Sequence, residues 1–131
     1  MNKIKVRIKN ITKSSLCAFI KLESLESNAV FSSILLDFDG RFTLGSECNA
    51  IFKENEVFIA DKNYHKISAR NRFISPITAI ECDDIFARIF LAFEGQTITS
   101  LITREAALEL DLKIGEEVLW FVKSNEVMIE S

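Results

Sequence analysis

The feature that most constrains this chain is an internal repeat, because its two halves carry the same apolar and polar pattern in the same order. Residues 16–22 align with residues 85–91, and residues 53–57 align with residues 123–127. Between these segments, Ser32-Ser33-Ile34-Leu35 matches Thr99-Ser100-Leu101-Ile102. Self-similarity of this kind indicates two copies of one structural unit. We divide the chain near residues 63–65 and predict one module over residues 1–63 and a second over residues 66–131.

Within each repeat the apolar residues recur with a period of two. Ile4, Val6 and Ile8 alternate with charged residues, which predicts a half-buried strand. Residues 118–122 form an unbroken apolar run, which is typical of a strand buried on both faces. About five short strands per repeat predict an all-β fold of two tandem OB-like small β-barrels. Modules of roughly 65 residues bury too little surface to be stable alone, so they should pack on each other or on neighbouring subunits.

One segment departs from the strand pattern. Residues 103–110 are rich in helix formers, and Thr103 is a suitable N-cap, so we predict a short helix over roughly residues 104–110 of the second module. The first module is three residues shorter here and carries Asp37-Phe38-Asp39-Gly40, which predicts a turn instead. Pro76 should lie at the start or the edge of a strand, because it lacks a backbone N–H.

Charge and cysteine content exclude several classes of protein. The net charge is −3, which gives no basic surface for nucleic acid. Cys17 and Cys82 border apolar runs and should pack as small hydrophobic groups. Neither a signal peptide nor a membrane-spanning stretch is evident, so we expect a cytoplasmic protein without membrane contact. Met1 stands directly before a strand, which favours a complete small protein.

The sequence lacks the common signatures of an enzyme. Its only histidine, His65, falls in the expected linker, which removes the usual nucleophile–histidine pairs and histidine-rich metal sites. The four glycines are scattered and form no phosphate-binding loop. The paired carboxylates Asp83-Asp84 and Glu116-Glu117 fit solvated turns. We therefore expect a binding protein and not an enzyme.

Two donor-rich segments of the second module are the best candidates for a binding site. Ser68-Ala69-Arg70-Asn71 comes just before a strand, and Lys123-Ser124-Asn125 comes just after one. Ser68 and Arg70 are two residues apart, so on an extended segment both side chains share a face. A tetrahedral dianion has acceptor oxygens and no donors, and charge-assisted hydrogen bonds hold it best. The residue types alone favour ordinary surface charges at Arg70 and Lys123 and a turn at Asn71.

The first of these segments resembles a known signature. Residues 67–71 are similar to the Ser-Ala-Arg-Asn motif that opens modules of the molybdenum-binding Mop (molbindin, TOBE-type) family, and residues 98–103, 112–118 and 122–127 follow in the family's order and spacing. The resemblance covers nearly all of the second module and, more weakly, the first. It implies a tandem pair of OB-like barrels that binds molybdate, and usually tungstate, between modules of different subunits.

Carried over by position, the resemblance implies an oxyanion site with no protein–metal ligation. The implied contacts are Ser68, Ala69, Arg70, Asn71, Thr103, Lys123, Ser124 and Asn125, with Lys53 of the first module lent to a shared pocket. Some positions depart from the family. Ala106 stands where a serine ligand is common, and Asn125 replaces a common serine. In the first module Met1 falls at the position of Arg70, Leu36 at that of Thr103, and Glu54 at that of Ser124.

These features predict storage, buffering or sensing of molybdate or tungstate. The alternatives are a sensor or interaction module of a molybdate-responsive regulator, or a structural barrel whose anion site has decayed. We expect a homo-oligomer, a trimer before a dimer, in which Arg70 and Lys123 come from different subunits. The sequence does not distinguish molybdate from tungstate, since the two ions are nearly equal in size and charge.

Overall fold

The computed structural model describes residues 1–64 and 66–131, so His65 lies outside the described residues. The first half contains β1 (Asn2–Ser14), β2 (Cys17–Ser24), β3 (Val30–Leu35), β4 (Glu47–Phe52), the 3-10 turn η1 (Glu54–Glu56) and β5 (Phe58–Asp61). The second half contains β6 (Asn71–Cys82), β7 (Phe86–Phe93), β8 (Gln96–Thr103), α1 (Arg104–Glu109), β9 (Glu117–Val122), the 3-10 turn η2 (Ser124–Glu126) and β10 (Met128–Glu130). The element order repeats from one half to the other, as the internal repeat predicts.

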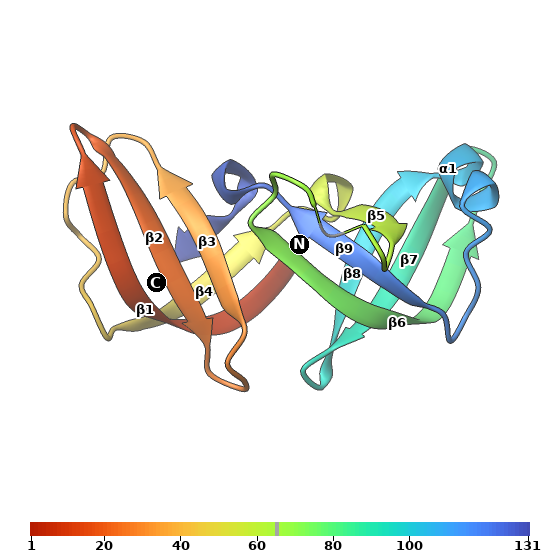
Figure 1. Ribbon diagram of the computed structural model, residues 1–131, viewed down its shortest axis with the longest axis horizontal. Helices are drawn as coiled ribbons and strands as arrows, with labels where there is room; N and C mark the ends of the chain where they lie inside the picture. The colour runs from red at the N-terminus through yellow and green to blue at the C-terminus, as the bar shows by residue number, and fades with distance from the viewer. Residues whose placement is uncertain (65) are drawn as a thin grey trace.

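The strands form two five-stranded antiparallel sheets that lie side by side (Figure 1). One sheet has the order β10-β4-β1-β2-β3 and the other the order β5-β9-β6-β7-β8. The two halves therefore exchange their last strands. Phe58–Asp61 pairs with β9 of the second half, and Met128–Glu130 pairs with β4 of the first. The boundary near residues 63–65 remains a prediction, but pairing crosses it in both directions.

Each sheet curls because its longest strand changes partner midway. Residues 71–76 of β6 pair with β9, and residues 77–82 pair with β7, with a register shift between Ile77 and Ala79. Strand β1 does the same with β4 and β2, with a shift between Ile8 and Asn10. Such irregularities bend a strand and increase its twist. The prediction of two small OB-like barrels, one with a short helix, is confirmed.

Pro76 lies in the interior of β6 and not at its start, where the sequence suggested it. It is the last residue of β6 in register with β9, opposite Glu117, and the ladder with β7 begins at the next residue. A proline is tolerated at this point because the strand is leaving one partner for another, which is equivalent to an edge.

One hydrophobic core runs through both halves. Phe31 of the first half lies 4.7 Å from Phe73 of the second between ring centroids, and Phe52 stacks 6.0 Å from Trp120. Trp120 is fully buried, and its indole Nε1–H donates to Ser75 Oγ at 2.9 Å, so its one polar group is satisfied. The two modules thus pack on each other, and β9 has the buried character that its apolar run predicts.

The helix and the turn differ between halves as expected. In α1 the Thr103 hydroxyl accepts from the Ala106 N–H at 3.0 Å, and Leu110 is the C-cap. In the described first half, no helix separates β3 from β4. The backbone turns there instead, with positive φ at Asp37 and Gly40. In neither half does a described helix have the length and apolar content needed to cross a bilayer.

The expectation that Cys17 and Cys82 pack as small hydrophobic groups is wrong for both. Cys17 and Cys82 are exposed, because they stand at strand ends beside hairpins whose apolar neighbours Leu16 and Ile85 are exposed too. Cys48, the second residue of β4, is the buried one, and burial raises the pKa of its thiol.

Candidate functional site

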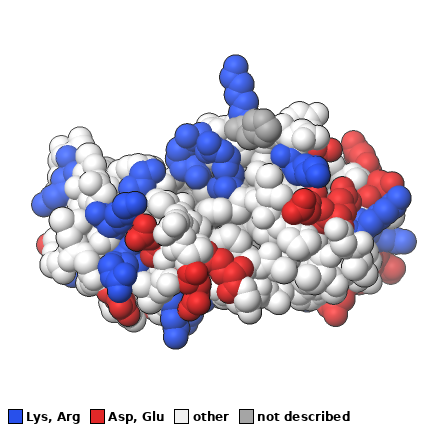
Figure 2. Space-filling view, turned by 60° about the horizontal axis from the view of Figure 1, so that its bottom comes forward, with Lys and Arg blue, Asp and Glu red and all other residues white. Residues whose placement is uncertain are grey.

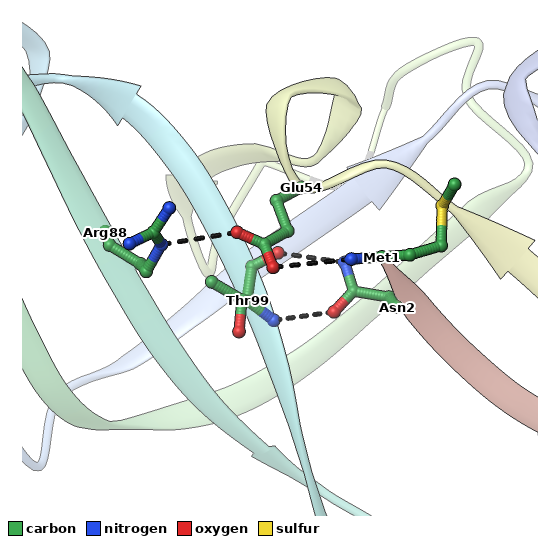
Figure 3. A network of polar contacts seen from close by, with 5 residues as sticks. All are labelled: Met1, Asn2, Glu54, Arg88 and Thr99. Carbon is green, nitrogen blue, oxygen red and sulfur yellow. Dashed lines mark hydrogen bonds and ion pairs between the residues drawn. The ribbon is translucent and has the colours of Figure 1, made fainter.

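Hydrogen bonds between the halves follow the internal repeat and fix the surroundings of the candidate site. The buried Asn71 amide donates to Ser32 O at 2.9 Å and accepts from Ser32 N at 2.6 Å. At the matching position, the Asn2 amide donates to Thr99 O and accepts from Thr99 N, both at 2.9 Å (Figure 3). Each asparagine begins the long strand of its own half and is bonded to the backbone of the other half. The residues that precede each asparagine are therefore held at the junction of the two modules.

A second matched pair fixes the two 3-10 turns. Ser33 Oγ donates to Val127 O, and Ser100 Oγ donates to Val57 O, each at 2.6 Å. Val127 follows η2 and Val57 follows η1, so each turn is held against a strand of the opposite half. The segment that contains Lys123 and Ser124 is thus positioned by both modules.

The pocket at this junction has a volume of about 350 Å³ and brings together three of the predicted site residues. Ser68 and Ala69 approach from the segment before β6, and Lys123 approaches from the end of β9. Phe58 and Phe121, stacked 5.3 Å apart between ring centroids, form part of its apolar wall. The remaining lining residues are Asn55, Glu56, Ile67 and Glu126.

Arg70 lies next to this pocket and is fixed by its own segment. Its Nε–H donates to Ser68 O at 3.1 Å and its Nη2 donates to Ile67 O at 2.6 Å, which leaves other N–H groups of the guanidinium for a ligand. Asn71 is in register with Val122, so the antiparallel ladder leads to Arg70 on one strand and Lys123 on the other. One chain therefore brings Arg70 and Lys123 to the same end of a ladder, and the donation of the two side chains by different subunits stays a prediction.

The other predicted residues fall into three groups. Asn71 is fully buried and fully bonded to Ser32, so it joins the modules and does not face the pocket. Ser124 is buried at the start of η2, whereas Asn125 is exposed beside it. Thr103 caps α1, and Lys53 is exposed before η1. The structure thus brings Ser68, Ala69 and Lys123 to one pocket, with Arg70 and Ser124 next to them in the chain, and it places Thr103 and Lys53 on other elements.

The charges around the pocket are of both signs. Among the described residues, neither Arg70 nor Lys123 has a carboxylate within ion-pairing distance. Half-buried Glu56 and Glu126 nevertheless line the pocket itself. Figure 2 shows one face of the molecule, on which basic and acidic side chains are interspersed with wide uncharged stretches between them. An anion bound here depends on short direct bonds and not on the general field of the protein.

Sequence reasoning missed two features of this region. The aromatic wall of Phe58 and Phe121 joins residues from different halves, and only the exchange of β5 brings them together. Lys21 on β2 was also missed: its Nζ lies 3.1 Å from Ser32 Oγ and 4.8 Å from the centroid of the Phe19 ring. Its alternating position on a strand gave no sign of these two contacts.

The first half has its own version of the site, with different chemistry. At Glu54, the counterpart of Ser124, the carboxylate Oε1 accepts from Arg88 Nε at 3.2 Å, and Oε2 lies 3.5 Å from the Met1 nitrogen (Figure 3). A carboxylate thus stands where the second half has a hydroxyl. In the described part of the chain, no group of three or more His, Cys, Asp or Glu side chains is arranged to hold a metal ion.

Comparison with known proteins agrees with this architecture. Residues 67–129 match the model of the TOBE domain family. This match covers 63 of the 131 residues, nearly all of the second module. A solved structure with molybdate bound, described as the cytoplasmic molybdate-binding protein ModG, is similar to the whole chain, with a TM-score of 0.90 and 25% sequence identity. That similarity covers 98% of this chain and 94% of the ModG chain, so it includes the tandem arrangement and not the TOBE module alone.

Curated relatives match over shorter segments. The molybdenum-pterin-binding protein MopB of Rhodobacter capsulatus is 38% identical over 65 residues, which are 49% of this chain and 24% of MopB. The molybdenum transport protein ModE of Azotobacter vinelandii is 41% identical over 66 residues, 49% of this chain and 24% of ModE. The molybdate/tungstate import ATP-binding protein WtpC of Pyrococcus abyssi is 28% identical over 105 residues, 80% of this chain and 28% of WtpC. The matches thus span about a quarter of the length of each of these relatives.

Proposed function

We propose that this protein binds molybdate, or an oxyanion of the same shape such as tungstate, without catalysing a reaction on it. The observation that carries the proposal is the junction pocket, where Ser68, Ala69 and Lys123 meet beside Arg70 although they are some fifty residues apart in sequence. The molybdate-bound state of the similar ModG structure and the names of the curated relatives support the same ligand class.

The chemistry of the donors suits a tetrahedral dianion. Arg70 and Lys123 supply positive charge, Ser68 and Ser124 supply hydroxyl donors, and the backbone N–H groups at the strand ends add further donors. The carboxylates of Glu56 and Glu126 oppose an anion, so selectivity rests on donors that reach the ion directly. The stacked rings of Phe58 and Phe121 give one side of the pocket an apolar surface, although Phe58 itself is exposed.

Calorimetric titration of the full chain with molybdate, tungstate and sulfate tests the proposal. We expect tight binding of molybdate and tungstate and weaker binding of sulfate, which is a smaller dianion of the same shape. Equal and weak binding of all three anions would favour the alternative of a structural barrel whose anion site has decayed.

For the biological role, we propose storage, buffering or sensing of the oxyanion in the cytoplasm. The match to ModE, a molybdenum transport protein that is longer than this chain, supports the alternative of a sensor or interaction module within a larger regulator. A fast release of bound molybdate on dilution fits buffering or sensing, whereas release over hours fits storage.

We further propose a homo-oligomer, a trimer before a dimer. Large apolar side chains are exposed on both halves, among them Leu36, Ile74, Ile85 and Ile114, and such surface is commonly buried between subunits. Light scattering at micromolar concentration tests this, and a monomer mass would refute it. We infer no direct contact with nucleic acid, since the net charge is negative.

A further inference from the structure

The Glu54 carboxylate is held in the way that a bound anion would be held. Each of its oxygens faces a nitrogen from a different segment: Oε1 lies 3.2 Å from Arg88 Nε on β7, and Oε2 lies 3.5 Å from the Met1 nitrogen before β1 (Figure 3). The side chain of Glu54 is 29% exposed, so it is partly withdrawn from solvent. Arg88 comes from the second half and Glu54 from the first, so the contact crosses the junction of the modules.

The register of the strands shows that the surroundings of Glu54 in the first module correspond to the surroundings of Ser124 in the second. Arg88 pairs with Leu101 in the second half, and Phe19 pairs with Ile34 in the first. Because residues 32–35 correspond to residues 99–102, Arg88 occupies the position that Phe19 has in the other copy. The first copy thus has a guanidinium that the second lacks at this position, together with a carboxylate that neutralises it.

We propose that Glu54 is a built-in anion that fills the first copy of the oxyanion site, so that Glu54 sets the number of external oxyanions per chain. The inference rests on the proposed function, which assigns the second copy to molybdate. Without the carboxylate, Arg88 and Lys53 become donors for a tetrahedral dianion at η1, as Arg70 and Lys123 are at η2. The chain then has two sites in place of one.

The test is calorimetric titration of the full chain with molybdate, comparing the parent with Glu54→Ser, which gives the first copy the residue that stands at Ser124. We expect the stoichiometry to rise from one to two molybdate ions per chain. The added site should disappear in the double variant Glu54→Ser/Arg88→Ala. Glu47→Ser is the matched control, since Glu47 also pairs with an arginine, Arg7 at 2.9 Å, but lies on β4 away from η1. It should keep the parent stoichiometry.

The outcomes separate this inference from the proposed function. A parent that binds one ion and a Glu54→Ser variant that also binds only one would overturn the inference and leave the proposed function intact. A parent that binds none and a variant that binds one would support the inference and refute the assignment of the second copy. Circular dichroism establishes that the variant is folded. If it is not, Glu54→Gln, which keeps the shape and removes the charge, takes its place under the same criteria.

Discussion

The two modules of this protein share their framework and differ in the charged groups that the framework positions. Asn2 and Asn71 make the same pair of backbone hydrogen bonds to the opposite half, and Ser33 and Ser100 make the same bond to the residue after a 3-10 turn. At the proposed ligand positions the copies diverge, with Glu54 in the first and Ser124 in the second. The contacts that join the modules are thus kept in both copies, whereas the binding chemistry is free to vary.

The largest effect that distinguishes the copies should come from Arg70, whose counterpart in the first module is Met1. Loss of one charged donor from an anion site typically costs about 2–5 kcal/mol, so we expect Arg70→Ala to weaken molybdate binding by roughly thirtyfold or more. Arg41→Ala should leave affinity unchanged, because Arg41 packs over the Phe42 ring in a loop of the first module. Calorimetry measures both, and parent-like affinity in Arg70→Ala would locate the site elsewhere.

The matched asparagines should differ in stability effect despite making the same bonds. Asn71→Ala leaves the buried N–H and C=O of Ser32 without partners, which we expect to lower the free energy of unfolding by about 2–3 kcal/mol. Asn2→Ala should cost only about 1–2 kcal/mol, because the bonds to Thr99 are partly buried and water can replace the amide. Urea denaturation gives both values. If the two variants lose the same free energy of unfolding, the two sets of hydrogen bonds are equally shielded from water.

Substitution of Thr103 tests whether this residue only caps α1 or also binds the ligand. Its counterpart in the first module is Leu36, whose side chain can do neither. Thr103→Ala removes the acceptor for the Ala106 N–H and should lower the free energy of unfolding by about 1 kcal/mol. We also expect weaker molybdate binding in this variant, as the family resemblance implies, and recovery of both properties in Thr103→Ser. A variant that is less stable but binds like the parent would make Thr103 a cap only.

The smallest effect concerns the β6–β7 turn, where Asp83 stands at the position of Ser14 in the first module. Hydrogen bonds from the Phe86 and Ile85 N–H groups hold the pKa of Asp83 below its ordinary value of 3.8. Because the folded pKa is the lower one, this stabilisation is complete above the unfolded pKa and is lost as the pH falls through the folded pKa. The parent should therefore exceed Asp83→Asn in stability at pH 6 and lose this advantage near pH 2. Asp84→Asn, the control, should show no such dependence.

Local sequence patterns predicted the strands and the helix of this fold well. They did not predict which strands pair with each other across the two halves. The period of two at Ile4, Val6 and Ile8 and the cap at Thr103 depend on near neighbours, so they could be read from the chain. The exchange of β5 and β10 could not be predicted, because two similar repeats offer each last strand two equivalent partners. The internal repeat by itself suggests that Phe58–Asp61 completes the sheet of the first half. In the structure this strand pairs with β9 of the second half.

The candidate site was predicted in part for the same reason. Ser68, Arg70 and Lys123 were found because they flank strands in a recognisable order, and the structure brings them to one junction. Asn71 belonged to the same motif, but its residue type does not tell a ligand from a buried link between modules. The role of Glu54 as the partner of Arg88 was hidden because the two residues are 34 positions apart and belong to different modules.

The exchanged strands also affect how the protein loses its structure. Each sheet is completed by a strand from the other half, so neither half can unfold without removing the edge strand of its neighbour. We expect a single cooperative transition in denaturant. Fragments cut near residue 64 would each carry a strand that pairs with the other fragment in the intact fold. Mixed in solution, they should assemble into a nicked copy of the intact fold, and the concentration at which they do so would measure how strongly the exchange binds the halves together.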